Sequence, residues 1–445
     1  MLVAILEKHA KRMPDEIGFI AGGVEVTWLS LHRKVKLFCD QLSRRRASRR
    51  ILYVDGRTSD DLALLIASSS LPGESILVSS FHSESRTKEL LSEFDGEDLL
   101  AAENDRIKVV GERKKPSPTP SAGTYVCLLT SGTTGSPKCV KYDWERISGA
   151  VSENSKYVGR RWLMGYHITN FAGIQVFLQC FVNGGCLVIP DQWPPSWAND
   201  VEALSKYQIQ YLNCTATYMR KILFSLADDM EIPLKSITLG GEMVDQVLID
   251  SLKRRLPAAK VNHIYASTEL GATIEVRDEK EGFPKELLLR GNLRIIEGEL
   301  YAKKSHRSML GYLGLTEASS MAPESDSWLP TGDLVDIEND RVIFLGRRDS
   351  MVNVGGFKVN PFGVEGVIRE VKGVKEVSVS GQKNPIAGNL LKAILVPCSD
   401  QDEKELKTRV LEHCRSRLPY YSVPRLFEFR EELTYTSSYK VKRNA

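Results

Sequence analysis

The chain has 445 residues, of which 42% are hydrophobic and 26% are charged, a composition typical of a globular protein with two or three domains. Its net charge of +3, from 60 basic and 57 acidic residues, gives no indication of a nucleic-acid partner, and no apolar run is long enough for a membrane span or a signal peptide. The eight cysteines are scattered without a Cys-x-x-Cys pair, which predicts reduced thiols in the cytoplasm and argues against a disulfide framework or a zinc site.

Helical and strand patterns alternate over the first 112 residues. The predicted helices cover residues 2–12, 28–45, 60–69 and 83–94, and the predicted strands cover residues 51–54, 75–79 and 107–111. A short hairpin is expected over residues 17–27, with its turn at Gly22 and Gly23. Strands that alternate with helices predict a parallel sheet covered on both faces.

A proline- and serine-rich linker at residues 114–123 leads into a loop rich in hydroxyl groups and glycines. A strand is predicted before this loop, at residues 124–129, and a helix after it, at residues 142–151. The candidate anion-binding residues of the loop are Thr130, Ser131, Gly132, Thr133, Thr134, Gly135 and Lys138. Backbone N–H groups, hydroxyls and the lysine ammonium would bind a phosphate, although the composition also fits a plain surface loop. No Gly-Lys-Ser/Thr triplet is present, so the P-loop NTPase template does not apply.

Strands and helices keep alternating up to residue 265. The predicted helices are 174–182, 201–207, 216–226 and 244–256, and the predicted strands are 186–189, 210–213, 237–239 and 261–265. Two more loops of small residues, at 240–242 and 266–271, follow predicted strands. Ligands of open α/β sheets bind at the carboxyl ends of the strands. Each loop alone also fits an ordinary turn, but three such loops, in what the pattern predicts to be strand–loop–helix settings, favour a ligand site.

The pattern changes after residue 287. Residues 287–345 contain short β segments, which suggest a smaller antiparallel or barrel-like piece. After the charged residues 347–349, two helical and three strand patterns predict a compact α+β unit of about 100 residues, the size of a separate domain. The expected fold class is therefore α/β: a large N-terminal domain of layered α/β sheets plus the small barrel-like piece, followed by a small α+β C-terminal domain.

Four single residues carry candidate chemistry. Glu269 stands beside a phosphate-binding loop, where a bridging Mg²⁺ would explain a carboxylate, although an isolated glutamate is usually a surface residue. Asp333 follows a turn and would accept the two hydroxyls of a ribose, or be an ordinary turn aspartate. His167 lies in a loop of aromatic and small residues, where a structural role is the usual one. By composition, Lys440 in the polar tail is simply solvated.

Several segments, in order and at similar spacing, resemble motifs of the adenylate-forming superfamily. This superfamily contains acyl- and aryl-CoA synthetases, adenylation domains of nonribosomal peptide synthetases, and luciferases. The matching segments are TSGTTGSPKCV from residue 130, IYASTELG from residue 264, LPTGDLV from residue 329, GRRDSMVNVGGFKVNPFGVE from residue 346 and LTYTSSYKV from residue 433. The resemblance is strong from about residue 124 to residue 440 and weaker before. The chain departs from the usual motifs at Asn353, Gly355 and Tyr439.

The resemblance implies a role for each motif. The first loop and Lys138 would hold the β- and γ-phosphates of ATP, while Tyr265 would stack on the adenine. Thr268 would contact phosphate, Glu269 would hold Mg²⁺, and Asp333 and Arg347 would bind the ribose. Lys440 would be the catalytic lysine of the tail. The remaining expected ATP-binding residues are Gly241, Glu242, Ala266 and Ser267.

The resemblance also divides the chain into an N-terminal adenylation domain, residues 1–347, and a mobile C-terminal domain, residues 348–445. Arg348 and Asp349 would form the hinge. His167 stands where peptide-synthetase adenylation domains carry an aspartate that pairs with the substrate's amino group. A histidine does not anchor an ammonium well, and its setting is more similar to acyl- and aryl-CoA synthetases, in which it gates the acyl pocket. The expected acid-binding residues are His167, Asn170, Phe171, Gly173, Gly240 and Gly271.

The sequence therefore predicts an enzyme: an AMP-forming ligase that adenylates an aryl or medium-sized acyl carboxylate with ATP and Mg²⁺ and then transfers the acyl group to CoA. One alternative is a stand-alone adenylation enzyme that loads the phosphopantetheine thiol of an acyl or peptidyl carrier protein. The alternative outside catalysis is a degenerate nucleotide-binding homologue. We expect no nucleic-acid partner and no membrane span.

Overall fold

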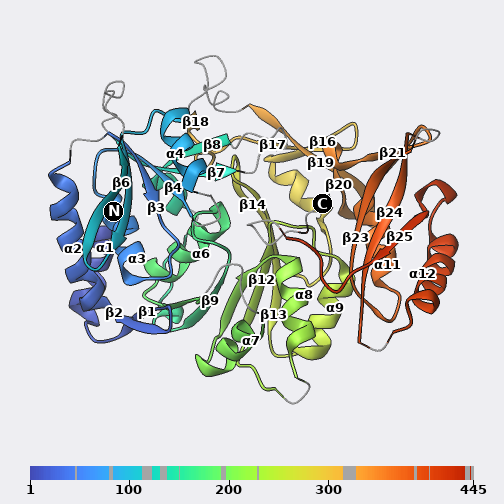
Figure 1. Ribbon diagram of the computed structural model, residues 1–445, viewed down its shortest axis with the longest axis horizontal. Helices are drawn as coiled ribbons and strands as arrows, with labels where there is room; N and C mark the ends of the chain where they lie inside the picture. Colours follow the sequence, from blue (N-terminus) through green and yellow to red (C-terminus); the bar gives the residue numbers. More distant parts are fainter. Residues whose placement is uncertain are drawn as a thin grey trace.

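The computed structural model covers the 445-residue chain and describes residues 1–45, 48–79, 84–112, 123–130, 138–149, 151–191, 197–227, 230–313, 327–384, 388–399, 401–435 and 441. The molecule is elongated, with the N-terminal helices at one end and the last helices and strands, in orange and red, at the other (Figure 1). Among the described residues, no helix is long and apolar enough to cross a membrane.

The larger of two mixed sheets has eight strands. They are β1 (Ile17–Ala21), β2 (Val24–Thr27), β9 (Arg161–Gly165), β10 (Cys186–Ile189), β11 (Tyr211–Cys214), β12 (Ser236–Gly240), β13 (Lys260–Ser267) and β14 (Gly271–Val276). Their order is β14-β13-β12-β11-β9-β10-β1-β2, with parallel neighbours inside and antiparallel pairs at the two edges. The parallel register brings the carboxyl ends of β9, β12 and β13 to one edge, as expected for a ligand site.

The second sheet has seven strands in the order β18-β8-β7-β4-β3-β5-β6. They are β3 (Arg49–Tyr53), β4 (Gly73–Val78), β5 (Asp98–Glu103), β6 (Arg106–Glu112), β7 (Thr124–Thr130), β8 (Lys138–Asp143) and β18 (Gly311–Leu313). The main hydrophobic core joins residues of both sheets with the helices between and beside them, including Leu52, Leu163 and Phe177. The prediction of covered, parallel strands is therefore confirmed for the inner strands of both sheets, whereas the outer pairs are antiparallel.

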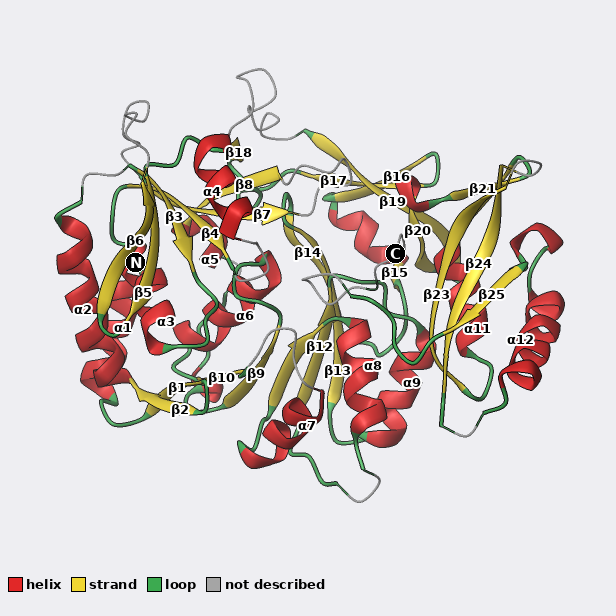
Figure 2. Cartoon of the chain, in the orientation of Figure 1, coloured by secondary structure: helices red, strands yellow, loops and turns green. Residues whose placement is uncertain are grey.

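Helices flank these sheets, and Figure 2 shows α8 and α9 beside β12 and β13. The helices are α1 (Leu2–Arg12), α2 (Trp28–Ser43), α3 (Ser59–Ser68), α4 (Glu84–Glu93), α5 (Trp144–Ser148), α6 (Phe171–Val182), α7 (Trp197–Lys206), α8 (Ala216–Ser225), α9 (Gln246–Arg255), α11 (Pro361–Arg369) and α12 (Glu403–Arg417). Short 3₁₀ helices are η1 (Ser155–Tyr157), η2 (Lys285–Arg290), η3 (Arg348–Ser350) and η4 (Tyr420–Ser422).

The predicted helix over residues 142–151 is wrong in its first part. Residues 138–143 form β8, which pairs antiparallel with β7, and α5 begins only at Trp144. Burial and pairing explain this result, because Cys139, Val140 and Tyr142 are buried and every residue of β8 pairs with β7. The loop at 266–271 likewise joins two antiparallel strands, β13 and β14. Of the three candidate loops, the one at 240–242 is thus followed by a helix, while the other two lie between strands.

The small β piece is an antiparallel sheet of five strands in the order β15-β20-β19-β17-β16. The strands are β15 (Phe283–Pro284), β16 (Leu293–Ile296), β17 (Glu299–Lys303), β19 (Trp328–Glu338) and β20 (Arg341–Arg347). The chain then forms a hairpin of β21 (Val352–Val354) and β22 (Phe357–Val359) and a three-stranded sheet of β23 (Val374–Asn384), β24 (Gly388–Pro397) and β25 (Leu426–Phe429). This C-terminal α+β part has a hydrophobic core of its own, which includes Val364, Leu395 and Val410.

Two buried carboxylates follow β3. Asp55 is 4% exposed and pairs with Arg57 at 2.6 Å, and Asp61 is 8% exposed near the start of α3. Burial, together with the charge of Asp55, raises the pKa of Asp61 to about 6. The folded protein therefore binds the Asp61 proton more tightly than the unfolded chain, whose aspartate pKa is near 3.9. The contribution of Asp61 to the free energy of unfolding therefore falls as the pH rises from about 4 to about 6, and this loss is complete above that range.

We expect Asp61→Asn to remove this loss, and so to stabilise the fold by about 1 kcal/mol more near pH 7.5 than near pH 5. Urea unfolding midpoints, followed by far-UV circular dichroism at the two pH values, measure the difference. Asp40→Asn, at an exposed position of α2, is the control and should leave the pH dependence of wild type. An equal effect of Asp61→Asn at both pH values would contradict the raised pKa.

Candidate active site

Three predicted nucleotide-binding residues meet where the five-stranded sheet faces the end of β13. The Tyr265 hydroxyl donates to Asp333 Oδ2 at 2.5 Å, and Arg347 Nη1 lies 3.5 Å from Asp333 Oδ1. Asp333 and Arg347 are direct partners across β19 and β20. The Tyr265 ring stacks on Phe344 with the ring centroids 4.9 Å apart. Burial and the nearby Asp333 charge raise the pKa of Tyr265, which therefore remains a hydrogen-bond donor.

A buried glutamate holds the turn beside Asp333. Glu299 is 5% exposed and accepts from the backbone N–H of Gly332 at 2.9 Å. Gly332 has φ +76°, a conformation that favours glycine, and a Cβ there would lie 2.9 Å from the Arg347 guanidinium. Glu299 also pairs with the predicted hinge residue Arg348 at 2.6 Å. Asp349, the other predicted hinge residue, lies 3.4 Å from Arg347.

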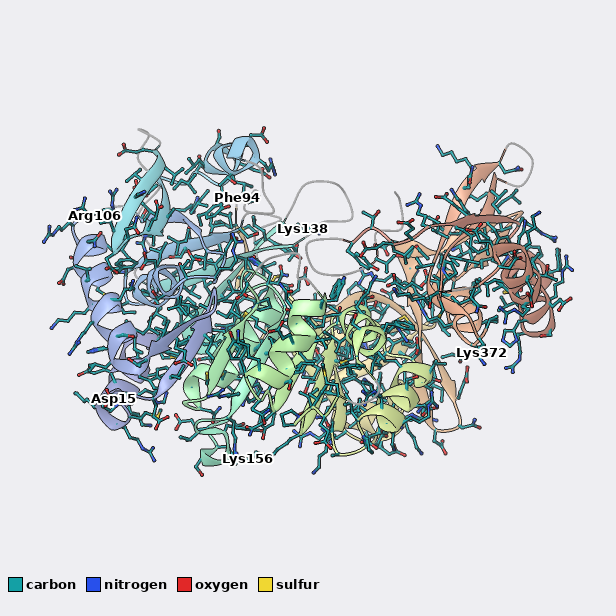
Figure 3. All side chains as sticks on the ribbon, turned by 60° about the horizontal axis from the view of Figure 1, so that its bottom comes forward. Asp15, Phe94, Arg106, Lys138, Lys156 and Lys372 are labelled. Carbon is teal, nitrogen blue, oxygen red and sulfur yellow. The ribbon has the colours of Figure 1, made fainter. Side chains whose placement is uncertain are left out.

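The predicted phosphate-side residues gather around Tyr312 of β18. Lys138 begins β8 opposite Thr130, and its Nζ lies 5.4 Å from the centre of the Tyr312 ring. The Tyr312 hydroxyl is 3.5 Å from Glu269 Oε1. Figure 3 shows Lys138 near the middle of the molecule, between the N-terminal elements and the C-terminal sheet. One tyrosine thus contacts both the cation and the carboxylate that the motifs assign to ATP and Mg²⁺.

Glu269 is chemically suited to a divalent cation. It is half-buried, and among the described residues no lysine or arginine forms an ion pair with it. Its neighbour Thr268 is held by the Tyr142 hydroxyl, which donates to the Thr268 carbonyl at 2.7 Å. The described residues contain no cluster of three or more metal-ligating side chains. A single carboxylate fits Mg²⁺, which is commonly bound by one or two carboxylates together with substrate phosphates.

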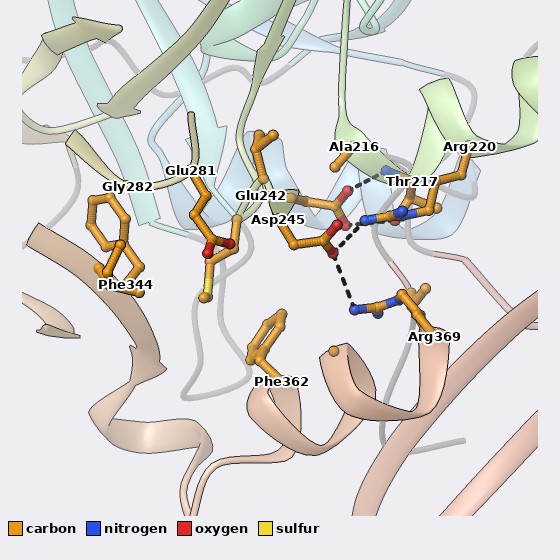
Figure 4. Close-up of a pocket in the computed structure, with 15 residues that line it drawn as sticks. Ala216, Thr217, Arg220, Glu242, Asp245, Glu281, Gly282, Phe344, Phe362 and Arg369 are labelled. Carbon is orange, nitrogen blue, oxygen red and sulfur yellow. Dashed lines mark hydrogen bonds and ion pairs between the residues drawn. The ribbon is translucent and has the colours of Figure 1, made fainter. Parts of the chain in front are cut away.

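The loop after β12 borders a cavity shared with the C-terminal part (Figure 4). Gly241 has φ +76°, and Glu242 accepts from the backbone N–H of Thr217 at 2.8 Å and from its hydroxyl at 3.0 Å. The cavity is also lined by Arg220, Asp245, Phe344, Phe362, Arg369 and Val441. Ala266 and Ser267 end β13 and pair with Ala272 and Gly271 of β14. The Ser267 hydroxyl accepts from the backbone N–H of Leu270 at 3.1 Å.

The predicted acid-binding residues divide between the core and the sheet edge. His167 is fully buried, its Nδ1 lies 2.9 Å from the Thr169 hydroxyl, and its Nε2 lies 3.6 Å from Asp55. Burial lowers the pKa of His167 in spite of Asp55, so the ring is neutral. Gly173 is packed so closely that a Cβ would lie 2.0 Å from the His167 carbonyl oxygen.

The other acid-binding candidates lie nearer the nucleotide residues. Asn170 caps α6, and the Phe171 ring is 5.7 Å from that of Tyr142. Gly240 accepts from the Tyr166 hydroxyl at 3.0 Å, and Gly271 has φ +77° beside the Arg307 carbonyl. The predicted residues Ser131, Gly132, Thr133, Thr134, Gly135 and Lys440 lie outside the described residues.

Several residues of this site carried no signal in the sequence. Tyr312, Tyr142 and Phe344 contact predicted site residues but lie outside the recognised motifs, and β18 reaches β8 from 170 residues further along the chain. Tyr312 is positioned by the pairing of β18 with β8, and no local sequence pattern predicts this pairing. The sequence predicts a helix at Tyr142, whereas the structure places this residue on β8, and the strand sets the direction of its side chain.

Comparison with known proteins agrees with this geometry. The family model of AMP-binding enzymes matches residues 58–287, just over half of the chain, and the model of the AMP-binding enzyme C-terminal domain matches residues 363–440. A 2-succinylbenzoate–CoA ligase of Bacillus licheniformis is 27% identical over 336 residues, which cover 71% of this chain and 68% of that protein. A D-alanine–D-alanyl carrier protein ligase of Staphylococcus epidermidis is 25% identical over 336 residues, which cover 71% and 69%.

Solved structures show the same fold. The o-succinylbenzoate CoA synthetase of Bacillus subtilis, in complex with its acyl-adenylate intermediate, has a TM-score of 0.74 at 20% identity and covers 99% of this chain and 97% of its own. An anthranilate CoA ligase in complex with anthranoyl-AMP has a TM-score of 0.81 at 16% identity, with 99% and 95% covered. The chain therefore belongs to the AMP-binding enzyme family and has the fold of adenylate-forming CoA ligases.

Proposed function

We propose that this protein is an ATP-dependent acid–thiol ligase that adenylates an aryl or medium-sized acyl carboxylate and transfers the acyl group to CoA. The observation that carries the proposal is the convergence of Tyr265, Asp333 and Arg347 at the sheet edge of a chain that belongs to this family. Its relatives include CoA ligases, and solved structures of the same fold contain acyl-adenylates.

In the first half-reaction, a carboxylate oxygen of the acid attacks the α-phosphorus of ATP. The bond from that phosphorus to the bridging oxygen breaks, and pyrophosphate leaves with the bonding electrons. Both reactants are anions, so catalysis depends on positioning and charge neutralisation. Lys138, Arg347 and Lys440 would supply positive charge. Mg²⁺, held by Glu269 and the phosphates, would neutralise the departing pyrophosphate.

In the second half-reaction, a thiol sulfur attacks the acyl carbonyl carbon, the bond to AMP breaks, and the thiol proton passes to solvent. We infer that residues 348–445 move between the two steps, which their separate hydrophobic core supports. The eight free thiols of the chain support a cytoplasmic location. The carrier-protein alternative has its own support, because D-alanyl carrier protein ligases are among the relatives.

The test of the adenylation step is acid-dependent exchange of labelled pyrophosphate into ATP, across a panel of aromatic and medium-chain acids. At least one acid should support exchange, and chelation of Mg²⁺ should abolish it. Asp333→Asn should raise the KM for ATP about tenfold or more. The substitution removes the charged carboxylate that contacts Tyr265 and Arg347 and that would bind the ribose of ATP. An absence of exchange with every acid, with ATP still bound in calorimetry, would instead support the degenerate nucleotide-binding homologue.

The thiol acceptor is decided by incubating the acyl-adenylate of the active acid with CoA or with a phosphopantetheinylated carrier protein. We expect the thioester on CoA, detected by mass spectrometry. A carrier protein without its phosphopantetheine arm is the control and should remain unmodified. A thioester that forms only on the loaded carrier would reverse the choice of acceptor.

The tail lysine separates the two half-reactions. Lys440→Ala should reduce pyrophosphate exchange by at least about a hundredfold, since it removes a charge needed where the carboxylate meets the α-phosphate. Thioester formation from preformed acyl-adenylate should stay within about threefold of wild type, a change of less than about 0.7 kcal/mol. Lys442→Ala, two residues further along the same tail, is the matched control and should retain both activities. An equal loss of both half-reactions would contradict this role of Lys440.

A further inference from the structure

A buried charged contact joins the C-terminal part to the large N-terminal part. Lys221 of α8 is 5% exposed, and its Nζ lies 2.8 Å from Oε2 of Glu376, which is 7% exposed on β23. Glu432 lies 3.6 Å from the same ammonium group. Both acidic partners belong to the C-terminal part, so this contact exists only while the two parts are in this arrangement.

Aromatic rings complete the contact. The Tyr435 hydroxyl donates to Glu376 Oε1 at 2.7 Å, so both oxygens of this carboxylate are engaged. The Lys221 ammonium lies 5.1 Å from the centre of the Tyr435 ring and 5.8 Å from that of Trp197. Burial and the Glu376 charge raise the pKa of Tyr435, which keeps its hydroxyl a donor. We call these five residues, Trp197, Lys221, Glu376, Glu432 and Tyr435, the anchor cluster.

The anchor cluster is adjacent to the tail. Tyr435 forms an isolated antiparallel bridge with Val441, so the chain between them begins and ends at this interface. Val441 lines the same cavity as Thr217 and Glu242 of the large part. Val441, the residue after Lys440, therefore lies at the same cavity as Glu242 of the candidate active site and is bridged to Tyr435.

A second interdomain ion pair is built differently. Asp245 lies 3.6 Å from Arg369 of α11, but it is also paired with Arg220 of its own part (Figure 4). If the C-terminal part moved away, Asp245 would keep Arg220. Lys221 would keep no acidic partner among the described residues, so its ion pairs are specific to this domain arrangement. The anchor cluster therefore biases the domain arrangement more strongly than the Arg369 pair.

We propose that Lys221 and Glu376 are positioning residues for adenylation: their buried pair selects the domain arrangement in which the tail is presented to the ATP site. A contact present in one of two arrangements shifts the population toward that arrangement by its differential free energy. The pair therefore favours the first half-reaction, and it is not required for thiol transfer. This inference rests on the proposed function, since it needs two half-reactions that can be measured separately.

The test compares Lys221→Met and Glu376→Gln in the full-length protein. Each should lower acid-dependent pyrophosphate exchange by at least about tenfold, while thioester formation from preformed acyl-adenylate stays within about threefold of wild type. Lys221→Arg, which keeps the charge, should recover most of the exchange. The double variant should lose little more than either single variant, because the two residues act as one unit. Lys253→Met, which removes an exposed ion pair with Glu279 inside the large part, is the control and should keep both activities.

Thermal unfolding of each variant separates positioning from folding. If Lys221→Met unfolds at the assay temperature, Tyr435→Phe, which loses one hydrogen bond but keeps the ring, must show the same selective loss of exchange. Equal losses in both half-reactions, or exchange that is unchanged in the folded variants, would overturn the inference while leaving the proposed function intact. An absence of exchange in wild type with every acid would overturn the proposed function and this inference together.

Discussion

The contact between the Tyr265 hydroxyl and the Asp333 carboxylate, at 2.5 Å, links two sheets that do not share hydrogen-bonded strands. Tyr265 lies on β13, directly after the last residue of that strand that pairs parallel with β12. Asp333 belongs to the antiparallel five-stranded sheet. Because Asp333 is paired in register with Arg347, the contact also fixes the last residue before the predicted hinge. One carboxylate that contacts both a tyrosine and an arginine thus connects the end of β13 to the residues next to the predicted hinge.

Charge is distributed along this edge in a consistent way. The carboxylates that would face ATP are each near a donor: Asp333 near Tyr265 and Arg347, Glu242 near Thr217, and Glu269 near Tyr312. The donors to Glu242 and Glu269 are the neutral residues Thr217 and Tyr312, so neither hydrogen bond brings a positive charge to these half-buried side chains. A negative edge repels a nucleotide polyphosphate unless cations accompany it. In the function proposed above, Mg²⁺ and Lys138 would therefore offset the charge of these carboxylates when ATP binds.

The sequence was sufficient for the parts of the site that lie in short, contiguous motifs. Tyr265, Asp333 and Arg347 were each assigned to the nucleotide from local segments, and the structure brings them together. The assignment failed where burial decided the outcome. The predicted helix over residues 142–151 begins two residues inside β8, because pairing with β7 and burial of Tyr142 extend the strand to Asp143. Local propensity is a weak prior that tertiary pairing overrides.

Lys221 could not have been selected from the sequence at all. It stands in an amphipathic helix, where a lysine is normally solvated, and its partners lie 155 or more residues further along the chain. Tyr312 is the same case, because only the pairing of β18 with β8 places its ring between Lys138 and Glu269. Contacts between elements remote in sequence carry no local periodicity, so they become visible only in the folded chain.

The two ends of the candidate site differ in how they are held. At the acid end, the His167 loop is buried and α6 packs against its backbone through Gly173, where no side chain would fit. If His167 gates the acyl pocket, as the family resemblance implies, rotation of its ring would break the contacts of the ring with Thr169 and Asp55. Lys440, by contrast, belongs to the C-terminal part, which contacts the large part through the Lys221–Glu376 ion pair. In the function proposed above, acid selection would therefore depend on a closely packed loop of the large part, whereas the charge of Lys440 would come from the part proposed to move between the two half-reactions.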